Sequence, residues 1–152
     1  MNKKIVITSI FPPTTAVEAF SRMSDYELIV VGDKKTPPDW SCENVHYISP
    51  ADQEQSGFEI SKLLPFNHYS RKMIGYLHAM AQGADLMVDT DDDNIPKPDW
   101  TFPEFDAEFD FIPANKGFVN VYQLYTDAPI WPRGLPLKLI KTQTTLSGLC
   151  DA

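Results

Sequence analysis

Cysteine is scarce in this sequence. Its two cysteines, Cys42 and Cys150, are far apart and lack the spacing of a metal-ligand pair, so we expect neither a disulfide framework nor a zinc site. Long apolar runs are also missing, because no stretch approaches the ~18–20 apolar residues of a membrane span. The run at residues 5–10 is too short for a signal peptide and is followed by Pro12 and Pro13. We therefore expect a cytoplasmic protein without a membrane span.

Positive charge is scarce too. The chain has 13 Lys and Arg against 21 Asp and Glu, a net charge of −8. Such a chain is a poor electrostatic partner for phosphate backbones or anionic lipid, so we expect no nucleic-acid partner. Hydrophobic residues make up 43% and charged residues 22%, which is typical of globular proteins and not of disordered ones. With 152 residues, we expect a single domain over residues 1–152.

The order of apolar patterns predicts an α/β protein. We expect strands at 4–10, 26–31, 45–48 and 85–88, and helices at 16–23 and 68–82. Asn67 is the expected cap of the longer helix, and Gly83 its expected end. This alternation predicts a mostly parallel, Rossmann-type sheet flanked by helices, which binds ligands beyond the carboxyl ends of its strands. The pattern is less regular after Asn94, where we expect strands at 111–112, 118–125 and 137–140.

The acidity is concentrated in residues 85–110, which hold ten acids and one base. The rest of the chain has 12 bases and 11 acids and is nearly neutral. Four carboxylates stand within residues 89–93, directly after the expected fourth strand, and they repel each other without a cation. Oxygen ligands at a strand end suit Mg²⁺ or Mn²⁺, which bind one or two carboxylates plus substrate phosphates. We expect a metal site rather than a solvated acidic turn.

Basic residues occur where a helix does not favour them. Arg71 and Lys72 fall near the amino end of the expected helix at 68–82, where the helix dipole disfavours cations. A bound anion would reverse that effect, so these two side chains are candidates for contacting a diphosphate whose other side faces the metal. Lys34, beyond the second strand, is a further candidate.

Several motifs resemble known families. Residues 29–37 (IVVGDKKTP) resemble the reversibly glycosylated polypeptides, or UDP-arabinopyranose mutases. Residues 64–77 (LPFNHYSRKMIGYL) and 131–136 (WPRGLP) resemble the STELLO glycosyltransferase-like family more closely. Both families are similar to GT-A glycosyltransferases, whose nucleotide-sugar half is a Rossmann-like sheet ending in a DxD motif.

The resemblance implies roles for individual residues. Asp91 and Asp93 would form the DxD pair that holds Mn²⁺ or Mg²⁺, with Asp91 also near the ribose. Arg133, in the WPRG motif, would lie near the sugar or diphosphate; it and Asp92 are the candidate catalytic residues. The further candidates for substrate binding, at strand ends and on the helix, are Thr8, Ser9, Asp33, Lys34, Arg71 and Lys72.

The expected function is therefore that of a metal-dependent glycosyltransferase-like protein that binds a nucleoside-diphosphate sugar, with UDP as the expected nucleotide. Residues 141–152 stand where the family continues into an acceptor-side region, so we expect that part to be short or missing. A non-catalytic module that binds the nucleotide sugar or a partner protein, and a UDP-sugar mutase, remain alternatives. A nucleotidyltransferase is disfavoured because no glycine-rich basic signature follows the first strand. The sugar, the acceptor and the state of oligomerisation stay open.

Overall fold

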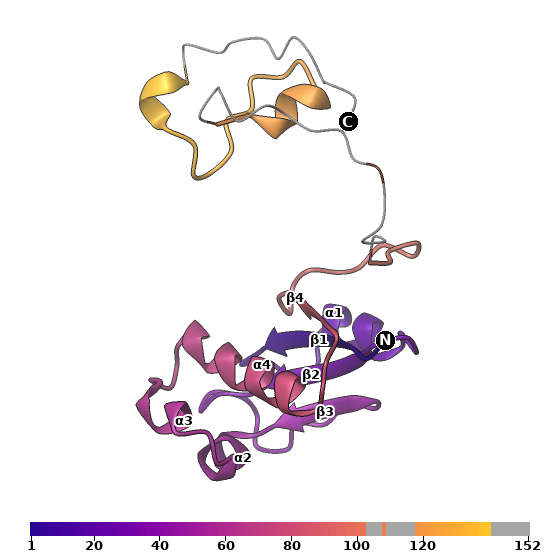
Figure 1. Cartoon of the computed structure of the whole chain (residues 1–152), viewed down its shortest axis with the longest axis vertical. Coiled ribbons are helices and arrows are strands. Elements are labelled where there is room, and N and C mark those ends of the chain that lie inside the picture. The colour runs from indigo at the N-terminus through magenta and orange to yellow at the C-terminus, as the bar shows by residue number, and fades with distance from the viewer. Residues whose placement is uncertain (103–107, 109–117, 141–152) are drawn as a thin grey trace. The chain divides into compact units, whose positions relative to one another are not determined.

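The computed structural model describes residues 1–102, 108 and 118–140. These residues belong to two compact units, Met1–Trp100 and Thr101–Ala152, and each is described here by itself (Figure 1). No helix in the described part of the chain is long and apolar enough to cross a membrane. The single domain expected over residues 1–152 stays a prediction.

The first unit is built on a sheet of four parallel strands in the order β3-β2-β1-β4. The strands are β1 (Lys3–Thr8), β2 (Glu27–Val31), β3 (Val45–Ile48) and β4 (Leu86–Asp89). The chain thus runs outward from β1 through β2 to β3 and then crosses to the other side of β1. That reversal beside β1 is the place where open parallel sheets bind ligands. The predicted α/β fold with a parallel Rossmann-type sheet is confirmed.

Both faces of the sheet are covered. Alternate residues of a strand point to opposite faces, so Ile5 and Ile7 pack on one side and Val6 on the other. Helix α1 (Thr15–Ser21) covers the first face and helix α4 (Lys72–Ala81) the second (Figure 1). Strands buried on both faces have continuous apolar sequences, which is why β1 and β2 could be recognised from sequence.

Helix α4 approaches the sheet closely at Gly75. A Cβ atom at Gly75 would lie 2.6 Å from Cγ1 of Val6 and 2.7 Å from Cγ2 of Val31. Only glycine fits between the helix backbone and these two strands. The close approach brings the first residue of α4, Lys72, near the carboxyl end of β4, where it contacts Asp89 and Asp91.

Three short helices connect β3 to α4. They are α2 (Pro50–Gln55), α3 (Ile60–Leu63) and η1 (Tyr69–Arg71), a turn of 3₁₀ helix. Ser49 and Asp52 form a reciprocal capping box at the start of α2.

The predicted long helix is present, but its start differs from the prediction. It forms as η1 followed by α4, and Gly83, with φ of 71°, follows its end as predicted. The cap at Asn67 was wrong: Asn67 has φ of 54° and the side chain of His68 caps instead, accepting a hydrogen bond from the amide of Ser70. Asparagine tolerates the left-handed conformation, so Asn67 serves as a turn residue.

The second unit contains two turns of 3₁₀ helix in its described part, η3 (Val121–Leu124) and η4 (Leu137–Leu139). The strands predicted at 118–125 and 137–140 were therefore wrong. Asn120 is buried and accepts a hydrogen bond from the amide of Tyr122, which favours a turn over an extended strand. The strand predicted at 111–112 and residues 141–152 lie outside the described residues.

The contact at Gly75 makes a testable prediction. In Gly75→Ala, helix propensity alone would add up to about 1 kcal/mol of stability. We expect the clash with Val6 and Val31 to outweigh it and lower the free energy of unfolding by about 1–3 kcal/mol. Urea denaturation measures this difference, and an unchanged or higher stability would contradict the packing described.

Candidate functional site

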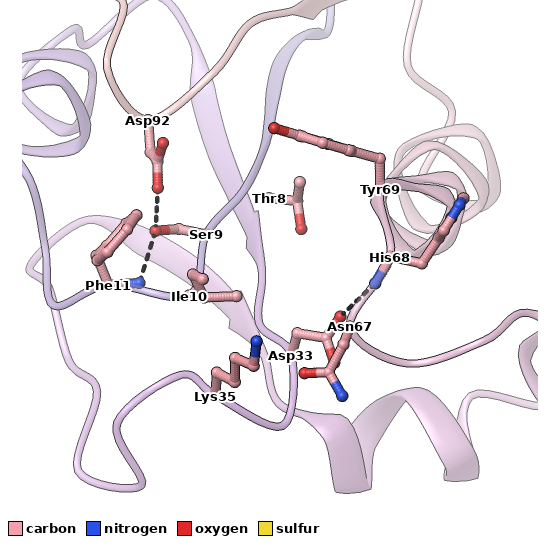
Figure 2. Close-up of a pocket in the computed structure, with 10 residues that line it drawn as sticks. All are labelled: Thr8, Ser9, Ile10, Phe11, Asp33, Lys35, Asn67, His68, Tyr69 and Asp92. Atoms are coloured by element: carbon pink, nitrogen blue, oxygen red, sulfur yellow. Dashed lines mark hydrogen bonds between the residues drawn. The ribbon is translucent and has the colours of Figure 1, made fainter.

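A pocket of about 410 Å³ lies at the carboxyl-terminal edge of the sheet in the first unit (Figure 2). Its walls come from the end of β1, the loop after β2, the segment before α4 and the loop after β4. The lining residues are Thr8, Ser9, Ile10, Phe11, Asp33, Lys35, Asn67, His68, Tyr69 and Asp92. Parallel strands end at one edge, so segments far apart in sequence converge here.

Ser9 and Asp92 join the loops after β1 and β4. The Ser9 hydroxyl, which is buried, donates to the Asp92 carboxylate and accepts from the amide of Phe11 at 3.2 Å. Thr14, the cap of α1, donates its hydroxyl to the Asp92 carbonyl at 2.5 Å. Two of the predicted site residues, 83 positions apart, therefore meet in one pocket wall.

Asp33 joins the loop after β2 to the segment before α4. It is only 3% exposed. One carboxylate oxygen accepts from the amide of Lys34 at 2.6 Å and the other from the amide of His68 at 3.3 Å. Figure 2 shows the second contact, between Asp33 and His68, both of which line the pocket. As placed, Asp33 shapes the pocket through backbone contacts.

The side chains of Lys34 and Lys35, which follow Asp33, point in different directions. Figure 2 shows the Lys35 amine turned toward the pocket. Lys34, the residue predicted for the site, instead places its Nζ 4.4 Å from the centroid of the Phe66 ring. Lys35 is therefore the lysine of this pair that lines the pocket, and the sequence alone did not distinguish them.

Arg71 lies inside the protein and does not line the pocket. Its side chain is fully buried, with Nε donating to Gln53 at 2.8 Å and Nη1 donating to the carbonyls of Ser61 and Leu64 at 2.8 and 3.0 Å. Its guanidinium carbon lies 4.0 Å from the Phe66 ring centroid. Burial lowers the pKa of Arg71, and the nearby Asp33 opposes that shift. Neutral carbonyl oxygens thus accept from Nε and Nη1, where the sequence suggested a diphosphate, while the buried Nη2 has no hydrogen-bond partner among the described residues.

Lys72, predicted to face the nucleotide, is bound to the acidic loop. Its Nζ forms ion pairs with Asp89 and, at 3.0 Å, with Asp91, and it donates to the carbonyl of Thr90 at 2.6 Å. Tyr76, one turn further along α4, lies against the carboxylate of Asp89. Burial and a hydrogen bond with Asp89 raise the pKa of Tyr76 to about 12. The loop after β4 is therefore held by the beginning of α4.

The metal predicted at Asp91 and Asp93 would find oxygen donors here but no complete cage. Within the residues that the structure describes, no group of three or more His, Cys, Asp or Glu side chains is placed to hold an ion. Asp93 is exposed and has no hydrogen-bond or ion-pair partner among those residues. Two carboxylates fit Mg²⁺ or Mn²⁺ when phosphate and water supply the remaining ligands.

Arg133 lies in the second unit and is described within that unit. It is exposed, in a turn where Gly134 has φ of 95°. Within that unit Trp131 packs edge-to-face on Phe118 with centroids 5.8 Å apart. The WPRG motif is therefore a turn anchored by a tryptophan.

Comparison with known proteins identifies two relatives, both from Arabidopsis thaliana and named probable glycosyltransferases STELLO1 and STELLO2. They are 28% and 27% identical to this chain over 149 aligned residues that cover 90% of it. The resemblance to the STELLO-type family is confirmed. The chain spans about a fifth of the length of these relatives, 19% of STELLO1 and 20% of STELLO2. No family model matches the chain.

The STELLO-like helix motif, residues 64–77, also explains part of what the sequence reading missed. Its Asn67, His68 and Tyr69 line the pocket, although none was a predicted site residue. The signal available in the sequence was their place at the amino end of the predicted helix, inside the motif that resembles the STELLO family. Ile10 and Phe11 were missed as well, and their place directly after Thr8 and Ser9 could have identified them.

The double role of the Asp33 carboxylate can be tested with Asp33→Asn. Asparagine has one carbonyl oxygen, so its amide nitrogen must face the amide of Lys34 or His68. We expect the free energy of unfolding to fall by about 1–3 kcal/mol, the cost of an unsatisfied buried donor. Asp39→Asn is the matched control, because Asp39 is exposed. Equal stability of the two variants in urea denaturation would show that the carboxylate contacts are unimportant.

Proposed function

We propose that this chain is the donor-binding part of a metal-dependent glycosyltransferase-like protein and that its pocket holds a nucleoside-diphosphate sugar. The observation that carries the proposal is the convergence of three strand ends on one pocket beside an acidic DxD loop. The names of the two relatives support the reaction class. UDP as the nucleotide rests on family analogy alone.

The pocket offers the chemistry that such a ligand needs. The hydroxyls of Thr8 and Ser9 donate to the Val31 carbonyl and to Asp92, so toward a ligand they can accept hydrogen bonds from ribose hydroxyls. The Lys35 amine supplies positive charge for a diphosphate. Phe11 and Tyr69, 55% and 79% exposed, offer apolar rings at the pocket mouth. Arg71 has no part in this proposal because its donors face the interior.

Asp91 and Asp93 are the residues that would hold Mn²⁺ or Mg²⁺. When bound, the ion would neutralise charge that develops on a departing diphosphate. Asp93 is the better direct ligand, since its carboxylate is exposed and Asp91 is paired with Lys72.

A binding module without transfer activity is the second candidate, and the pocket carboxylates favour it. Asp33 accepts two backbone hydrogen bonds and Asp92 accepts one from Ser9, so neither is poised as a general base in this arrangement. In this reading, transfer needs groups outside the pocket. Of the two catalytic candidates predicted from sequence, Asp92 lines the pocket and is bonded to Ser9, so Arg133 of the second unit is the remaining candidate. Release of UDP from a UDP-sugar by the isolated chain would favour the complete enzyme.

Calorimetric titration tests the proposal directly. We expect UDP to bind more tightly with Mn²⁺ than without it, and more tightly than GDP under the same conditions. Asp93→Asn should remove the effect of Mn²⁺ while leaving the urea denaturation curve unchanged, since Asp93 is exposed. Asp99→Asn is the matched control, an exposed aspartate in the same acidic segment. An affinity for UDP that changes neither on addition of Mn²⁺ nor in Asp93→Asn would contradict the metal assignment.

A further inference from the structure

Lys72 contacts three oxygen atoms at the last residue of β4 and in the segment directly after it. Its ammonium group meets the carboxylates of Asp89 and Asp91 and the carbonyl of Thr90. An ammonium group has three donors, so this arrangement can use all of them. The residue is only 8% exposed, which means that the amine is fixed beside the loop rather than moving freely in water.

The ion pairs of Lys72 offset repulsion among neighbouring carboxylates. Four of the five residues from Asp89 to Asp93 are aspartates, and their mutual repulsion disfavours the folded loop. Among the described residues, Lys72 is the basic side chain that forms ion pairs with this cluster. A positive charge at this place does for the protein what a bound cation would do.

We propose that Lys72 is an internal counter-cation that holds Asp91 in the metal-free protein and competes with a divalent ion for it. The inference rests on the metal site of the proposed function, and it adds a statement about the order in which the metal ion and the nucleotide bind. The loop binds a divalent ion weakly until a diphosphate supplies further oxygen ligands. Metal and nucleotide then bind together, because the fixed charge of Lys72 repels the ion and attracts the diphosphate.

The test is a titration of Mn²⁺ alone into the whole chain and into Lys72→Met. Removing a unit charge about 3 Å from Asp91 leaves two uncompensated carboxylates, so Lys72→Met should bind Mn²⁺ at least about tenfold more tightly than the native chain. The variant should also be less stable without metal and gain more stability from Mn²⁺. Lys62→Met is the matched control: it changes the net charge equally, but Lys62 is exposed, and its ion pair in the described part of the chain is with Glu59.

Two outcomes would overturn the proposal. One is a Lys72→Met protein that binds Mn²⁺ no more tightly than Lys62→Met does, because a merely structural lysine would lower stability without raising metal affinity. The other outcome applies if Lys72→Met does not fold without metal. In that case both Lys72→Met and Lys72→Gln, which keeps a hydrogen-bond donor, should fold when Mn²⁺ is added. Failure of both to fold at saturating Mn²⁺ contradicts the proposal.

The result can be separated from the fate of the proposed function. If UDP does not bind but Lys72→Met gains affinity for Mn²⁺, the role of Lys72 stands and the nucleotide site is wrong. If UDP binds with Mn²⁺ while Lys72→Met and Lys62→Met behave alike, the donor site stands and the counter-cation is wrong.

Discussion

The parallel pairing of β1 with β2 on one side and β4 on the other determines where this chain can bind a ligand. It brings the three carboxyl ends to one edge, so Ser9, Asp33 and Asp92 line one pocket although they are far apart in sequence. The close approach of α4 at Gly75 depends on the same sheet. Through that helix, the sheet also determines the position of Lys72 beside the acidic loop.

Repulsion among the four aspartates of that loop is compensated differently at each position. Lys72 pairs with Asp89 and Asp91, and the hydroxyl of Ser9 donates to Asp92. Asp93 is exposed, so water screens its charge. The loop can therefore fold without an ion and still offer carboxylate oxygens to one. This combination suits an ion that arrives with its own phosphate ligands rather than a permanent structural metal.

The sequence predicted the parts of the fold that depend on local pattern. β1 and β2 are buried on both faces, and their apolar runs identified them; Gly83 marked a helix end because it can adopt positive φ. Side-chain direction could not be read this way. Arg71 and Lys72 are neighbours, yet one points into the interior and the other toward the acidic loop. Likewise only one of the two lysines after Asp33 reaches the pocket. Such differences in side-chain direction arise from tertiary packing, which the sequence pattern alone does not contain.

The central claim is that the ligand binds where β1, β2 and β4 end, and mapping UDP with Mg²⁺ onto the backbone amides by NMR tests it most directly. The chain, at 17.2 kDa, is small enough for such spectra. The predicted result is a set of shifted amides concentrated at Ser9, Phe11, Lys35 and His68, which line or border the pocket. Shifts confined to Trp100 and to Phe20 of α1, whose rings pack edge to face, or no shifts at all, would contradict it.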